Sequence, residues 1–156
     1  MGETATNLMP CNNGAIRQTA RMLGQLYDDV LAPSGLRATQ HTLLYTIQVM
    51  DAPTLGEMAQ AMVMDLSALG RSLKPLEREG LVAIVPDPAD GRAKRATLTK
   101  AGVKKLKYTA ELWRNAQDRF EKAFGAKRAE ELRSVLISLS SSEFREAFEH
   151  FSALKK

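Results

Sequence analysis

Two short helical segments separated by a tight turn constrain the fold of this chain more than any other feature. Thr54 begins the first segment, and Glu57 three residues later completes the pattern of a capping box. Asp65 is placed to cap the second segment, which Gly80 ends. Only residues 63–64 lie between the two segments. Two short helices joined by so short a turn predict a helix-turn-helix.

A β-hairpin is predicted directly after the second helix. Residues 81–85 are apolar and β-rich, residues 86–91 are dense in turn formers, and residues 95–98 resume an extended pattern. The hairpin therefore has a long polar tip, and a hairpin that follows a helix-turn-helix is a wing. The predicted fold class is mainly α with a small β-hairpin wing.

Longer helices are expected on both sides of this module. The first has a cap at Asn12 or Asn13 and ends at the Pro-Ser-Gly sequence of residues 33–35. A buried helix follows a cap at Thr39. A further helix, about 39 Å long at 1.5 Å per residue, is expected from its cap at Thr99 to Phe124.

The long helix carries a coiled-coil-like pattern, and two amphipathic segments follow it. Its apolar residues, with one glutamine, recur at alternating spacings of three and four: Val103, Leu106, Ala110, Trp113, Gln117, Phe120 and Phe124. We therefore expect a flexible N-terminal arm at residues 1–11 and a winged helix-turn-helix DNA-binding domain at 34–99. Residues 12–33 and 100–156 form the expected helical dimerisation region.

The charge of the chain is concentrated in this module. The net charge is only +4, but residues 65–107 hold ten Lys and Arg against five Asp and Glu. The whole basic surplus therefore lies on the second short helix, the hairpin and the helix that follows. Such a distribution is expected of a protein that binds a polyanion, although on charge alone a merely solvated basic face fits equally well.

The second short helix is the expected recognition helix, since the N-terminal end of that helix enters the major groove in helix-turn-helix proteins. Four residues are expected to face DNA: Ser67, Ala68, Arg71 and Lys74. Three leucines that alternate with them are expected in the core: Leu66, Leu69 and Leu73. Serine suits phosphates or base edges, alanine a thymine methyl group, and arginine guanine. Pro75 is expected to bend or loosen this helix.

The predicted tip of the wing supplies further cations. Arg92, Lys94 and Arg95 lie on or beside the flexible loop. An arginine in this position can enter the minor groove, where the negative potential of DNA is strongest. The combination of a recognition helix and a basic wing is more specific than either feature alone.

Three stretches of the chain resemble the multiple antibiotic resistance regulator (MarR) family. Residues 90–102 (DGRAKRATLTKAG) are similar to the wing signature of that family and the helix start after it. Residues 35–40 (GLRATQ) resemble the entry to its second helix, and residues 76–82 (LEREGLV) its helix-to-strand junction. The resemblance extends over residues 12–139.

The resemblance implies a homodimer whose first and last helices interlock and whose two winged heads bind a pseudo-palindromic operator on double-stranded DNA. It also implies a repressor released by a small-molecule effector, an aromatic carboxylic acid or its thioester. Arg92 is then the wing arginine, held by an ion pair with Asp90, while Ser67, Ala68 and Arg71 face the groove. Leu66 departs from the family pattern, in which this position is often polar or basic.

Five residues are candidates for the effector site. Arg17 and Arg21 lie one turn apart and suit a carboxylate, whereas His41, Tyr45 and Trp113 suit an aromatic ring. Each has a structural alternative: the arginines as ion-pair partners between subunits, His41 as a half-buried side chain, and Trp113 as part of the core.

The single cysteine, Cys11, excludes an intramolecular disulfide and a Cys-rich zinc site. Its place just before a predicted helix allows an alternative function, that of a peroxide-sensing repressor. A second alternative is a non-specific DNA-binding structural protein, which would share the basic region.

An enzyme is not expected. The sequence has no phosphate-binding loop, no metal-ligand spacing and no nucleophile elbow, so no catalytic residue, metal or cofactor is predicted. Residues 1–9 do not resemble a signal peptide and no apolar run is long enough to span a membrane, so we expect a cytoplasmic protein with no membrane partner.

Overall fold

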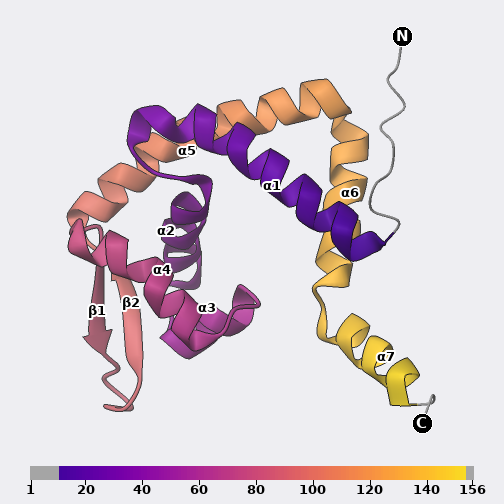
Figure 1. Cartoon of the computed structure of the whole chain (residues 1–156). Coiled ribbons are helices and arrows are strands. Elements are labelled where there is room, and N and C mark those ends of the chain that lie inside the picture. The colour runs from indigo at the N-terminus through magenta and orange to yellow at the C-terminus, as the bar shows by residue number, and fades with distance from the viewer. Residues whose placement is uncertain (1–10, 154–156) are drawn as a thin grey trace.

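A computed structural model describes residues 11–153, and most of them are helical (Figure 1). The elements in chain order are α1 (Asn12–Leu31), the short 3-10 helix η1 (Ala32–Ser34), α2 (Ala38–Met50), α3 (Leu55–Ala61), α4 (Leu66–Arg78), β1 (Val82–Pro86), β2 (Lys94–Leu98), α5 (Lys100–Phe124), α6 (Ala126–Leu139) and α7 (Ser142–Ala153). The predicted class, mainly α with a β-hairpin, is confirmed. The predicted N-terminal arm lies outside the described residues, except for Cys11.

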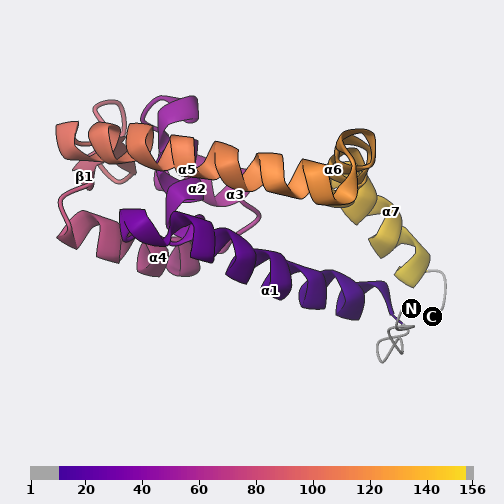
Figure 2. The same ribbon diagram turned by 90° about the horizontal axis from the view of Figure 1, so that it is seen from above.

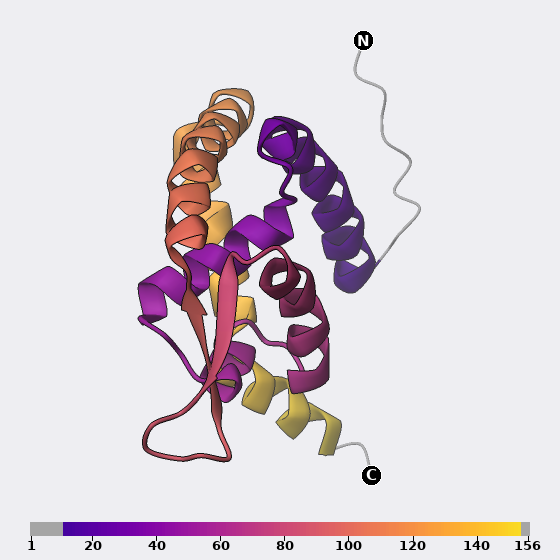
Figure 3. The same ribbon diagram turned by 90° about the vertical axis from the view of Figure 1, so that its left-hand side faces the viewer.

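The helices form two groups. α1 and α5 contact each other and lie side by side in the view from above (Figure 2), and α6 leads from the far end of α5 to α7. The elements α2, α3, α4, β1 and β2 form a second group, here called the winged head, whose hairpin tip projects freely (Figure 3). No helix among residues 11–153 has the length and apolar character needed to cross a membrane.

The winged head has its own hydrophobic core. Leucines from α2 and α4 fill it together with Met58 of α3, Val82 of β1 and Ala96 of β2. Leu106 of α5 belongs to the same cluster. The head is therefore built on the start of α5, which fixes the head relative to the long helix.

The predicted caps of α3 and α4 are confirmed. Thr54 and Glu57 form the capping box of α3, and the Asp65 carboxylate accepts the N–H of Ala68 at 2.7 Å at the start of α4. Gly80 has a φ of 70°, the left-handed conformation that ends α4 and turns the chain into β1. α4 remains helical through Pro75.

Two caps differ from the prediction. Cys11, rather than Asn12 or Asn13, caps α1, because its Sγ accepts the N–H of Gly14 at 3.3 Å. α2 begins at Ala38, one residue before the predicted cap at Thr39. Two contacts bond this end of the helix: the Asp28 carboxylate of α1 accepts the N–H of Ala38 at 2.7 Å, and the Gln40 amide oxygen accepts the N–H of Arg37 at 2.9 Å.

The C-terminal part of the coiled-coil-like pattern of α5 faces α1 of the same chain, whereas Leu106 packs in the core of the head. The Tyr27 hydroxyl of α1 donates to the Gln117 amide oxygen at 3.0 Å, and Phe120 and Phe124 line a cavity with Leu23 of α1. The pattern therefore joins α1 to α5 within one chain. The division into a DNA-binding and a dimerisation region remains a prediction.

Candidate DNA interface

The N-terminal half of α4 presents a continuous exposed surface. Ser67, Arg71 and Lys74 are exposed and Ala68 is half-buried, whereas Leu69 and Leu73 are buried. The expectation that Leu66 also lies in the core is wrong, because 57% of this residue is exposed. The first turn of α4 extends beyond the core cluster, which begins at Leu69 on this helix.

The turn before α4 fixes the direction of this helix. The N–H of Met64 donates to the carbonyl of Ala59 at 2.9 Å, and the N–H of Val63 donates to that of Gln60 at 3.1 Å. Val63 itself has a φ of 52°, a left-handed conformation that β-branched residues rarely adopt. The turn thus holds α3 and α4 in the arrangement of a helix-turn-helix.

The hairpin is attached to the loop between α2 and α3. β1 and β2 pair antiparallel from Val82 opposite Leu98 to Pro86 opposite Lys94. The N–H of Ala96 also donates to the carbonyl of Pro53 at 3.0 Å. The strands of the wing therefore cannot turn freely about the head.

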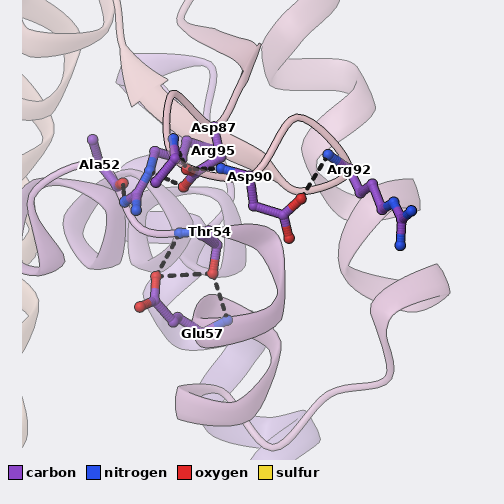
Figure 4. Close-up of polar contacts among 8 residues, drawn as sticks. Ala52, Thr54, Glu57, Asp87, Asp90, Arg92 and Arg95 are labelled. Atoms are coloured by element: carbon purple, nitrogen blue, oxygen red, sulfur yellow. Dashed lines mark hydrogen bonds and ion pairs between the residues drawn. The ribbon is translucent and has the colours of Figure 1, made fainter.

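Asp87 organises the tip of the wing (Figure 4). Its buried carboxylate accepts the N–H groups of Ala89 at 2.7 Å and Asp90 at 3.0 Å, and it forms an ion pair with Arg95. The two backbone N–H groups, followed by the Arg95 guanidinium, hold the pKa of Asp87 below its usual value. The carboxylate is therefore kept charged inside the wing.

Arg95 joins the wing to the head. Besides the ion pair with Asp87, its Nη1 donates to the carbonyl of Ala52 at 2.7 Å (Figure 4). Ala52 has a φ of 59°, so Arg95 holds the α2–α3 loop at an unusual backbone position. Nε and Nη1 of this guanidinium are engaged within the chain, so Arg95 positions the wing, and its contact with DNA stays a prediction.

The ion pair expected between Asp90 and Arg92 does not form. The Asp90 carboxylate instead accepts the backbone N–H of Arg92 at 3.0 Å, a turn that leaves the side chain free. The Arg92 side chain points away from the wing (Figure 4), and within residues 11–153 no ion pair or hydrogen bond engages its guanidinium. Lys94 is likewise exposed. These two side chains are the wing cations available to DNA.

Sequence reasoning missed Asp87. The signal was present in the Pro-Asp-Pro sequence of residues 86–88, because an aspartate in a turn commonly bonds backbone N–H groups two and three residues ahead. The partner choice of Arg95 had no such signal, since it depends on how the hairpin packs against a loop more than 40 residues earlier.

Replacement of Arg95 by alanine is expected to loosen the wing. In this variant the buried carboxylate of Asp87 loses its cation, and the carbonyl of Ala52 loses its donor. At the tip, the N–H of Asp87 donates to the carbonyl of Ala93, and the N–H of Ala93 donates to that of Asp90. Both N–H groups should exchange with solvent about tenfold faster or more. Hydrogen exchange measured by NMR tests this.

Lys94→Ala is the matched control, because Lys94 is an exposed cation on the same strand. It should leave these exchange rates unchanged. Equal exchange rates in the wild type and Arg95→Ala would show that Arg95 does not hold the wing.

Two of the five predicted effector residues lie together. His41 is buried, its Nδ1 is hydrogen-bonded to Thr109 Oγ1 at 2.9 Å, and its ring stacks on Trp113 with 6.1 Å between centroids. Burial lowers the pKa of His41. Arg17, Arg21 and Tyr45 are exposed.

A cavity of about 340 Å³ lies between α1, α2, α5 and α6. Trp113 alone of the five predicted effector residues lines it, together with Leu23, Tyr27, Phe120, Leu132 and Arg133. Arg133 also lies 3.6 Å from the Glu121 carboxylate. In the described part of the chain, no three His, Cys, Asp or Glu side chains are grouped to hold a metal ion.

Comparison with known proteins agrees with this geometry. Residues 36–94 match the model of the MarR family. The chain is 29% identical over 117 residues to an uncharacterized HTH-type transcriptional regulator of Bacillus subtilis, YwoH, covering 70% of this chain and 85% of that protein.

Solved structures with the same fold contain DNA. The M. tuberculosis transcriptional regulator MosR, solved in complex with DNA, is 32% identical to this chain and has a TM-score of 0.75. The match covers 88% of this chain and 97% of the MosR chain. A mutant of MarR from E. coli, solved with operator DNA, has 23% identity and the same TM-score of 0.75, over 88% of this chain and 99% of that one.

Proposed function

The chain belongs to the MarR family of DNA-binding transcriptional regulators, and from this premise we propose that it is a repressor that binds a pseudo-palindromic operator as a homodimer and leaves it when a small aromatic acid binds. One observation carries the proposal: the exposed start of α4 and the cationic tip of the wing lie at the same end of the head (Figures 1 and 3). The proposed DNA contacts are Ser67, Ala68, Arg71, Lys74, Arg92 and Lys94.

Each element has a distinct part in this proposal. The start of α4 enters the major groove, where Arg71 bonds a guanine and Ala68 meets a thymine methyl group. Arg92 enters the adjacent minor groove, and Lys94 pairs with a phosphate. Asp90 contributes indirectly, since its bond to the backbone of Arg92 shapes the turn from which that side chain extends.

Exposed apolar side chains support the homodimer. They lie on the helices outside the head: Ile16, Met22 and Leu26 on α1, Val135, Leu136, Ile137 and Leu139 on α6, and Phe144 and Phe148 on α7. So many large apolar side chains on neighbouring helices mark an interaction surface. A second copy of the chain is the partner that gives two heads, as a pseudo-palindrome requires.

A charge at Ile137 is expected to prevent dimerisation. This residue is 66% exposed in the single chain, so Ile137→Glu should cost the fold of the protomer little. In a dimer the same carboxylate would be buried without a partner, at a cost of several kcal/mol. Light scattering at about 10 µM protein should therefore show a dimer for the wild type and mainly monomer for Ile137→Glu.

The control for this experiment is Lys127→Glu, which places a carboxylate at an exposed polar position of the same helix. It should remain dimeric. A wild-type protein that is monomeric at this concentration would contradict the proposed homodimer.

The cavity of about 340 Å³ between the head and the outer helices supports the effector proposal. It offers aromatic surface at Trp113 and Phe120 and a guanidinium at Arg133, the chemistry that an aromatic carboxylate needs. Its walls come from α2 of the head as well as from α1, α5 and α6. A ligand there favours one spacing of the two heads over another and so alters DNA affinity.

A footprint on the DNA that flanks the gene of this protein tests the proposal. The expected result is protection of two inverted half-sites whose centres lie one helical turn, or a multiple of it, apart. A panel of aromatic acids and their thioesters should contain a compound that removes the protection. Protection of a single half-site would contradict the two-headed arrangement.

The position of Cys11 favours one alternative, a repressor that senses peroxide. Its thiol is exposed and sits at the N-cap of α1, a setting in which reactive cysteines occur. This alternative predicts that mild peroxide treatment releases the wild-type protein from DNA and leaves Cys11→Ser bound. Unchanged binding of the wild type after stoichiometric oxidation of the thiol would exclude it.

A further inference from the structure

Leu66 is an exposed apolar residue in the first turn of α4, the helix that also carries the exposed cations Arg71 and Lys74. It continues the stripe of Leu69, Leu73 and Leu76 at helical spacing, yet these three are buried while 57% of Leu66 is exposed. The apolar stripe of α4 therefore runs out of the core and onto the N-terminal end of the helix.

The surroundings of Leu66 identify its partner. Arg71 and Lys74 are exposed on the same helix, and the tip of the wing, whose loop carries the exposed Arg92, lies at the same end of the head as the start of α4. Asp65, the residue before Leu66, is engaged in capping α4. A surface with this charge attracts a polyanion, so the occupant that fits Leu66 is an apolar group carried by DNA.

Only one base presents such a group in the major groove. Thymine carries a C5-methyl group, whereas the other bases present hydrogen-bond donors and acceptors without it. A leucine side chain forms no hydrogen bonds. If it lay against those polar edges, it would displace the water bonded to them and offer no hydrogen bond in its place. Contact with leucine therefore favours thymine and disfavours the other bases.

We propose that Leu66 is a specificity-determining residue that contacts a thymine methyl group in each half-site of the operator. This inference rests on the proposed function, since it requires a specific operator bound through α4. It adds a residue to the base-reading set and an expectation about the sequence read: each half-site contains a thymine beside the bases contacted by Ser67 and Arg71.

Replacement of thymine by uracil tests the proposal, because uracil pairs identically and lacks only the methyl group. Each thymine of a half-site is replaced in turn, and affinity is measured by fluorescence anisotropy. Uracil in place of the thymine that Leu66 contacts should weaken binding of the wild-type protein about fourfold when one half-site is changed. The loss should be about fifteenfold when both half-sites are changed, as the loss of one buried methyl group per site implies.

Two variants assign the effect to the side chain. In Leu66→Ala the same uracil substitution should have little further effect, because the contact is already absent. Alanine is the better helix former, and Leu66 lies outside the core, so α4 should be retained in this variant. Val49→Ala, at an exposed apolar position of α2, should keep the full response to uracil.

The outcomes separate this inference from the proposed function. A wild-type protein that prefers no DNA site overturns the proposed function and this inference with it. A specific site whose affinity is unchanged by uracil at every thymine overturns this inference and the thymine contact of Ala68, while specific binding of the operator stands. An undiminished response in Leu66→Ala overturns this inference alone.

Discussion

Simultaneous replacement of Arg71 and Arg92 by alanine is expected to abolish specific DNA binding and to leave the fold unchanged. Arg71 is on the recognition helix and Arg92 on the wing, and both side chains are exposed. A bidentate arginine contact contributes about 1–3 kcal/mol of discrimination, and a dimer carries each contact twice. Affinity for the operator should therefore fall by about a hundredfold or more.

The two single variants should differ in kind. Arg92→Ala removes a contact to the minor groove and should weaken binding to all sequences, with a shallower dependence on salt. Arg71→Ala removes a base contact and should mainly relax the preference at one base pair. Anisotropy titrations on the operator and on single-base variants of it, at two salt concentrations, separate these effects.

The control is Lys122→Ala with Lys127→Ala, which removes two exposed positive charges near the junction of α5 and α6. It should bind the operator as the wild type does. Equal binding by the wild type and by Arg71→Ala/Arg92→Ala would show that DNA is bound elsewhere on the molecule.

Gly102→Ala is expected to be strongly destabilising. Gly102 is buried in the first turn of α5, where its N–H donates to the Thr99 hydroxyl at 3.0 Å. A Cβ at this position would overlap the carbonyl oxygen of Leu81, which accepts the N–H of Thr99. The backbone fixes the position of the Cβ, and the Leu81 carbonyl is part of the backbone. No side-chain rotation therefore relieves the overlap, and α5 must move away from β1.

The expected loss is about 3 kcal/mol or more in the free energy of unfolding, the upper end of what overpacking costs. Urea denaturation at a fixed protein concentration measures it, since a dimer unfolds in a concentration-dependent way. Gly70→Ala is the control: no atom lies within 4 Å of its added Cβ, and it lies within α4. It should stabilise the protein by about 0.5–1 kcal/mol. A urea midpoint of Gly102→Ala equal to that of the wild type would contradict the close contact of α5 with Leu81.

The parts of the fold that depend on neighbouring residues could be predicted from the sequence. The caps at Thr54, Asp65 and Thr99 and the stops at Gly80 and Gly125 bond or bend the chain within three residues of themselves, so local sequence determines them. The hairpin belongs to the same class, because its turn and strands are adjacent in the chain.

The parts that depend on packing could not be predicted. One of the two contacts that bond the start of α2 comes from Asp28 on another helix, and the place of Arg95 is set by Asp87 and the carbonyl of Ala52. Periodicity placed Leu66 in the core because it cannot tell where a core ends. The different settings of the two wing arginines have the same cause, since Arg95 bonds within the chain while the guanidinium of Arg92 is engaged by no ion pair or hydrogen bond in the described residues.

The ratio of specific to non-specific DNA affinity tests the central claim most directly. The wild-type protein is titrated at physiological salt with the footprinted operator and with a duplex of the same length and composition in scrambled order. A regulator that reads bases through α4 and the wing should bind the operator about a thousandfold more tightly or better. Equal affinity for the two duplexes, with a salt dependence that accounts for all of the binding, would contradict the account and indicate a protein that coats DNA without reading it.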